Sequence, residues 1–133
     1  MLIPTVNLLV PVVAGIAGFA FGGFYWGALF GNTWRRLEGK TREELAFTRQ
    51  ALAAGLITRI VGAYILTLFI SYAGGKSVID GAEIGFLAWL GFVITISIGS
   101  AMFERESWKL FALRVPATLI EFTMTGAIIG ALL

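Results

Sequence analysis

The chain has 133 residues, which favours a single domain. Hydrophobic residues make up 58% of it and charged residues only 14%, whereas soluble domains are about a quarter charged. Cysteine and histidine are both absent, which excludes disulfides and thiolate metal sites and removes the commonest general base. The net charge of +2 is too small to indicate nucleic-acid binding. We therefore predict a membrane protein with no catalytic group, metal or cofactor.

Four apolar stretches are long enough to cross a bilayer as helices, since about 20 residues suffice. They span residues 4–30, 51–72, 82–103 and 115–133. The first has no charged residue near its start and is too long for the apolar region of a signal peptide, so we expect it to be retained. The prediction is an all-α, integral membrane four-helix bundle that forms one domain over residues 1–133.

The second helix is predicted to extend beyond the membrane. Thr41 followed three residues later by Glu44 fits a capping box, the pattern that satisfies free backbone donors at a helix start. No glycine or proline intervenes before Ala51. We therefore expect one long helix that begins near Thr41.

Basic residues indicate an orientation. The connection over residues 31–50 carries five Lys and Arg and that over 104–114 carries three, whereas the one over 73–81 carries a single lysine. Cytoplasmic loops are enriched in Lys and Arg. We predict a multi-pass protein of the bacterial inner (cytoplasmic) membrane with these two connections in the cytoplasm and both termini outside.

Glycines four residues apart suggest close helix packing, because small residues let membrane helices approach each other. These ridges are Gly18 with Gly22, Gly23 with Gly27 and Gly31, and Gly126 with Gly130. The ridges on the first helix could serve packing inside the bundle, a homo-oligomer interface, or both. Tyr25, Trp26 and Trp34 are expected at headgroup level, where Trp and Tyr are enriched.

Arg59 and Glu121 are the charges inside the predicted spans, where such residues usually face the bundle interior. Both helices enter the membrane from the same side, and the two residues lie at similar depths. We predict that their side chains are neighbours. The pair could fix helix register, line a cavity for an ion or small polar solute, or let Arg59 snorkel to the headgroups. Residues that could extend this polar site are Thr118, Thr125, Thr95 and Glu104.

The segment from Tyr25 to Trp34 resembles the signature of a bacterial family of small membrane proteins, domain of unknown function 1761. That signature has an aromatic pair, Gly, Pro, Leu, Phe, Gly and a later Trp. Here Ala28 replaces the proline and the aromatic pair is reversed. Further likeness lies in residues 80–85, 89–92, 103–111 and 126–128, and implies the same four-helix layout. Arg114 and Thr118 stand where the family tends to have Asn and His, so an activity that rests on that His would be altered.

Three functions are compatible with these patterns. The first is a non-enzymatic, oligomer-forming or accessory subunit of a membrane complex, whose partners would be lipids, itself or other membrane subunits. The second is a small ion or solute transporter or channel formed by oligomerisation around Arg59 and Glu121. The third is a lipid-modifying enzyme that uses Glu104 and the basic loop.

Overall fold

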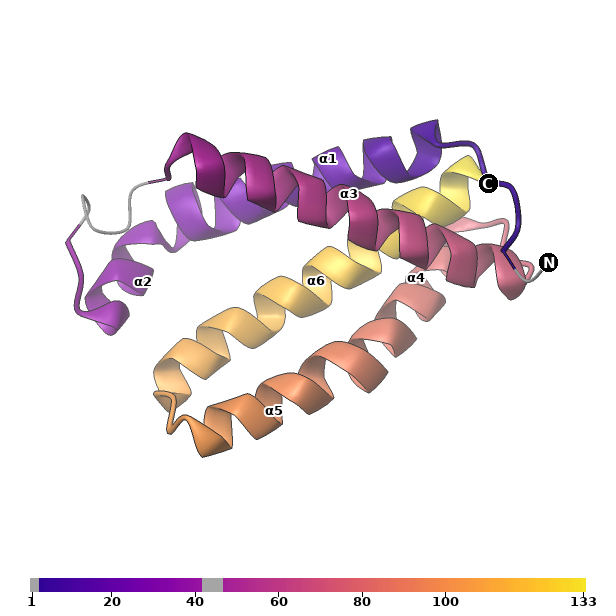
Figure 1. The fold of residues 1–133 in the computed structure, drawn as a ribbon. Helices are drawn as coiled ribbons and strands as arrows, with labels where there is room; N and C mark the ends of the chain where they lie inside the picture. Colours follow the sequence, from indigo (N-terminus) through magenta and orange to yellow (C-terminus); the bar gives the residue numbers. More distant parts are fainter. Residues whose placement is uncertain (1–2, 42–46) are drawn as a thin grey trace.

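The computed structural model describes residues 3–41 and 47–133, and within these ranges the chain is helical and without strands. Four long apolar helices run up and down (Figure 1). The first combines α1 (Leu9–Gly23) with a π-helical turn, η1 (Phe24–Leu29). The second is α3 (Arg49–Tyr72). The third combines α4 (Val78–Ala88), a π-helical turn η2 (Trp89–Val93) and α5 (Ile94–Phe103), and the fourth is α6 (Trp108–Leu132).

These helices confirm the predicted all-α membrane fold. Each is long and apolar enough to cross a bilayer. Large apolar side chains stay exposed along them, among them Ile57 at 60%, Ile96 at 67% and Phe103 at 92%. Exposing such an apolar surface to water is unfavourable, whereas exposing it to lipid is not. The helices also satisfy their backbone polar groups internally, as lipid requires.

The helix boundaries differ from the prediction in several places, and the third long helix begins at Val78, four residues before the predicted start. The first helix begins at Leu9, where the Asn7 side chain accepts a hydrogen bond from the Leu9 amide. The fourth begins at Trp108, seven residues before the predicted start, and contains Pro116. A short helix, α2 (Gly31–Glu38), occupies part of the predicted loop and ends at Gly39, whose φ of 68° suits glycine.

The predicted extension of the second helix back to Thr41 is wrong. Thr48 is extended, with φ −78° and ψ 163°, and its hydroxyl accepts a hydrogen bond from the Ala51 amide. This N-cap starts α3 at Arg49. The expected capping box at Thr41 falls largely on residues 42–46, outside the described residues.

Backbone contact joins α4 to α6, the most extensively packed pair of elements. A Cβ on Gly81 would overlap the carbonyl oxygen of Gly126, and one on Gly130 would overlap the carbonyl oxygen of Ser77. Only glycine permits this approach, so Gly126 and Gly130 lie in a helix–helix contact as their spacing suggested. The contact lies near the end of the bundle that holds both termini (Figure 1).

The core consists of two apolar clusters. One contains Val10, Ala14, Ala63, Leu66, Ile70, Ala88 and Ile129. The other contains Tyr25, Leu113 and Ala117, packed against Phe21, Trp26, Phe30, Trp34 and Leu37. Along α6, Glu121 and Thr125 lie between the residues of the two clusters. A polar layer therefore separates the two apolar clusters of the core.

Candidate functional site

Arg59 of α3 and Glu121 of α6 form the polar layer between the two clusters. The Arg59 Nε lies 2.9 Å from Glu121 Oε1, so the structure brings these side chains together as their matched depths suggested. At 1.5 Å per residue, Arg59 lies about 15 Å and Glu121 about 20 Å from the starts of their helices, well inside each span. The side chains are 31% and 18% exposed. Arg59 therefore does not snorkel out of the bundle.

The hydrogen-bonding capacity of Arg59 is poorly used. Its Nε–H is not aimed at an acceptor despite the short distance to Glu121, and is buried without a hydrogen bond. Its Nη1 donates a long hydrogen bond of 3.4 Å to the Gly55 carbonyl. A guanidinium has five N–H donors, so most of its capacity remains available.

Glycines of α1 make room for this pair. A Cβ on Gly18 would lie 3.3 Å from Glu121 Oε1, and one on Gly22 would lie 3.0 Å from Arg59 Nη2. The Gly18–Gly22 ridge therefore faces the ion pair inside the bundle. The other predicted ridge does not pack against a long helix: among the described residues, a Cβ on Gly23 would meet nothing within 4 Å, and one on Gly27 would meet the Phe47 ring at 3.9 Å. Gly31 begins α2 and faces the Trp26 carbonyl and the Arg35 side chain.

Two cavities meet at Arg59. The larger, about 440 Å³, lies toward the α2 end of the bundle; the smaller, about 130 Å³, lies toward the termini. Arg59 lines both cavities, whereas Glu121 lines only the smaller one. The ion pair therefore stands between two spaces, with its cation turned to the larger. The larger cavity is lined by Phe19, Ala20, Gly22, Gly23, Trp26, Trp34, Glu38, Phe47, Ala51, Leu52, Gly55, Arg59, Glu106, Leu110 and Arg114.

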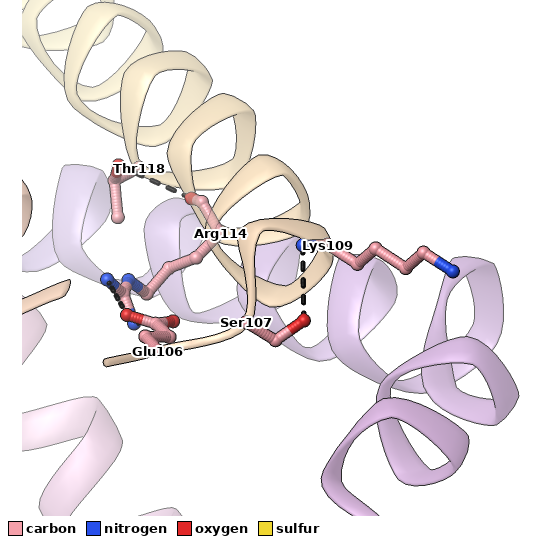
Figure 2. Close-up of polar contacts among 5 residues, drawn as sticks. All are labelled: Glu106, Ser107, Lys109, Arg114 and Thr118. Carbon is pink, nitrogen blue, oxygen red and sulfur yellow. Dashed lines mark hydrogen bonds and ion pairs between the residues drawn. The ribbon is translucent and has the colours of Figure 1, made fainter. Parts of the chain in front are cut away.

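A second ion pair borders the larger cavity. Arg114 Nη1 and Nη2 donate to the two carboxylate oxygens of Glu106 at 2.5 and 2.8 Å (Figure 2). Ser107 caps α6 by accepting from the Lys109 amide, which places Glu106 just before the helix and close to Arg114. Two parallel hydrogen bonds satisfy one edge of the guanidinium. Arg114 is thus neutralised within its own segment.

The remaining predicted polar residues are divided. Thr125 lines the smaller cavity together with Glu121. Thr118 accepts a hydrogen bond of 2.9 Å from the Trp89 indole, joining the third and fourth helices. Thr95 and Glu104 do not join the site: both are exposed, and Thr95 donates to the Gly91 carbonyl in its own helix. The π-helical turn η2 immediately before α5 rotates the helix faces, which a regular 3.6-residue repeat does not anticipate.

Several site residues were not anticipated. Glu106 occupies the role expected of Glu104, and Trp89 provides the contact to Thr118. Tyr25 is buried inside the bundle, and its hydroxyl donates to the Leu113 carbonyl at 2.5 Å. Trp26 lines the larger cavity. The clustering of aromatics between residues 19 and 34 was the available indication of an aromatic wall.

No arrangement in the described ranges suggests a metal centre, since nowhere do three or more acidic side chains converge. The site instead combines one under-used cation, apolar walls and a partly open cavity. Such a combination suits binding of a small molecule, because ligand sites are concave, largely apolar and equipped with few polar groups.

Comparison with known families matches residues 9–130 to the family described as protein of unknown function (DUF1761). The chain belongs to this family. The match covers all four long helices, so the fold described above is that of a DUF1761 member, as the resemblance of its tryptophan-rich segment indicated. No curated protein and no solved structure matches the chain.

Proposed function

We propose that this DUF1761 protein is a non-enzymatic carrier that binds a small organic solute inside the membrane and passes it across. The observation behind the proposal is the pair of cavities that meet at Arg59. A solute in the larger cavity would reach the Arg59–Glu121 pair, and the smaller cavity continues beyond it. A charge pair that can open and close is a reasonable barrier between two such spaces, because intramembrane charges commonly mark solute pathways.

The proposed orientation places the larger cavity toward the bacterial cytoplasm. Four basic residues lie in the described segments 31–41 and 47–50 and three over 104–114, at the same end of the bundle as this cavity. The excess of Lys and Arg in cytoplasmic loops supports this direction. Both termini would then lie outside.

Assembly with a second copy or another membrane subunit is the second candidate. The third membrane helix is the least buried of the four. Its exposed apolar side chains, among them Leu87, Phe92 and Ile96, could pack against a neighbouring helix. Four helices rarely enclose a pathway alone, so the two candidates are compatible: a carrier of this size would work as an oligomer.

Cysteine labelling tests the proposal, and because the sequence contains no cysteine, an introduced cysteine is the only thiol that can react. Ala20→Cys places a thiol at the exposed edge of the larger cavity, whereas Ile16→Cys and Phe24→Cys, one turn to either side, replace residues that are also exposed but do not line it. In reconstituted vesicles, a membrane-impermeant maleimide should label Ala20→Cys faster than both controls. In sealed vesicles the labelling should come from the cytoplasmic face. A rate at or below those of the two controls would show that the cavity is not open to water and would refute the carrier proposal.

A further inference from the structure

The larger cavity is bordered by Arg59, whose Nη1 donates a long hydrogen bond of 3.4 Å to the Gly55 carbonyl. Nη1 and Nη2 of Arg59 lie beside Gly55 and Gly22, which line the larger cavity and not the smaller. Its Nε edge is turned to Glu121, which is absent from the larger cavity's lining. A solute in this cavity therefore meets the positive side of the pair.

The other charges of this cavity do not offer an equivalent partner. Arg114 is held by Glu106 through two hydrogen bonds, so that pair is close to neutral. Glu38 is exposed and lies in α2, away from the membrane-embedded pair. Among the described residues, Arg59 is thus the charge available to a ligand in this cavity, and its sign selects an anion.

The apolar lining of the larger cavity indicates the nature of the ligand apart from its charged group. This lining consists of aromatic and aliphatic side chains, among them Phe19, Trp26, Trp34, Phe47, Leu52 and Leu110. They favour an apolar body, and the volume of about 440 Å³ is within the range of small-molecule sites. A planar guanidinium edge matches the two oxygens of a carboxylate.

Resting on the proposed carrier function, we propose that the larger cavity binds a small organic monocarboxylate with an apolar body. The carboxylate accepts hydrogen bonds from Nη1 and Nη2 of Arg59, and the body lies against the aromatic wall. Glu121 keeps the Nε edge and competes electrostatically with the ligand. Removing the Glu121 charge should therefore tighten binding, an effect that a purely structural pair would not produce.

The test measures how three probes protect Ala20→Cys from alkylation. Hexanoate, hexylammonium and hexanol share one apolar chain and differ in the head group. Hexanoate should slow alkylation at much lower concentration than the other two. In the Ala20→Cys background, Arg59→Gln should raise the half-protecting concentration about tenfold or more, the scale of a hydrogen bond to a charged group. Glu121→Gln should lower it, and Arg59→Lys, which keeps the charge without the planar edge, should be intermediate.

The outcomes separate the two proposals. If Ala20→Cys labels no faster than its flanking controls, the carrier proposal itself fails. If it labels rapidly but hexylammonium or hexanol protects as well as hexanoate, or no probe protects, the cavity stands and the carboxylate assignment is overturned. Unchanged helical content and monodispersity of Arg59→Gln and Glu121→Gln, together with basal labelling of Ala20→Cys, exclude misfolding as the cause.

Discussion

Substituting Gly126 by alanine tests the backbone contact between α4 and α6. The added Cβ would overlap the Gly81 carbonyl oxygen and lie 3.0 Å from its carbon and 3.1 Å from the Gly85 Cα. The contact with this oxygen is the limiting one, so the two backbones must separate by about 1 Å and forfeit about half of each contact's attraction. Overpacking costs about 1–3 kcal/mol. Because the obstacles are backbone atoms, we expect the upper end, about 3 kcal/mol.

Gly99 provides the matched control. It lies in α5, and a Cβ there would meet nothing within 4 Å. Alanine is favoured over glycine in a helix by about 1 kcal/mol, so Gly99→Ala should be neutral or stabilising. Gly126→Ala gains the same helix propensity within α6, so the two variants should differ by the overpacking cost, about 3 kcal/mol in the free energy of unfolding. Titration of detergent-solubilised protein with a denaturing detergent, followed by circular dichroism, measures this difference. Equal stabilities would refute the close-contact reasoning.

Two further predictions use the same unfolding assay. Arg59→Met and Glu121→Leu should each destabilise the protein, because each leaves the other charge unpaired. The double variant should lose less free energy of unfolding than the sum of the two single losses, with a coupling of about 0.5–3 kcal/mol. Additive losses would show that the pair is not coupled. Thr118→Val should cost about 1 kcal/mol, since the buried Trp89 indole loses its acceptor while the side-chain shape is preserved. Wild-type stability of Thr118→Val would mean that this hydrogen bond contributes nothing.

Local properties made the long helices and the central pair predictable. Membrane spans can be predicted from the lengths of the apolar stretches, which are read directly from the sequence. Arg59 and Glu121 could be paired because both lie inside spans that enter from the same side, and helical rise converts their positions into depth. Their contact at 2.9 Å needs only that α3 and α6 lie side by side.

Features that depend on competing local choices were not predictable. Thr41 and Thr48 are both suitable N-caps, and nothing in the flanking residues decides between them, yet the structure uses Thr48. The placement of Glu106 depends on where α6 begins. Once Ser107 caps the helix, Glu106 rather than Glu104 is within reach of Arg114.

The glycine contact and the larger cavity lie at opposite ends of the bundle, and this separation has an evolutionary consequence. At the α4–α6 contact, any side chain would push the backbones apart, so few substitutions of Gly81 and Gly126 can be tolerated during evolution. At the cavity, by contrast, substitutions of Ala20 and Leu52 would change the shape of the space without disturbing the α4–α6 contact. Family members can therefore diverge in the molecule that their cavity binds while they keep the same helix packing.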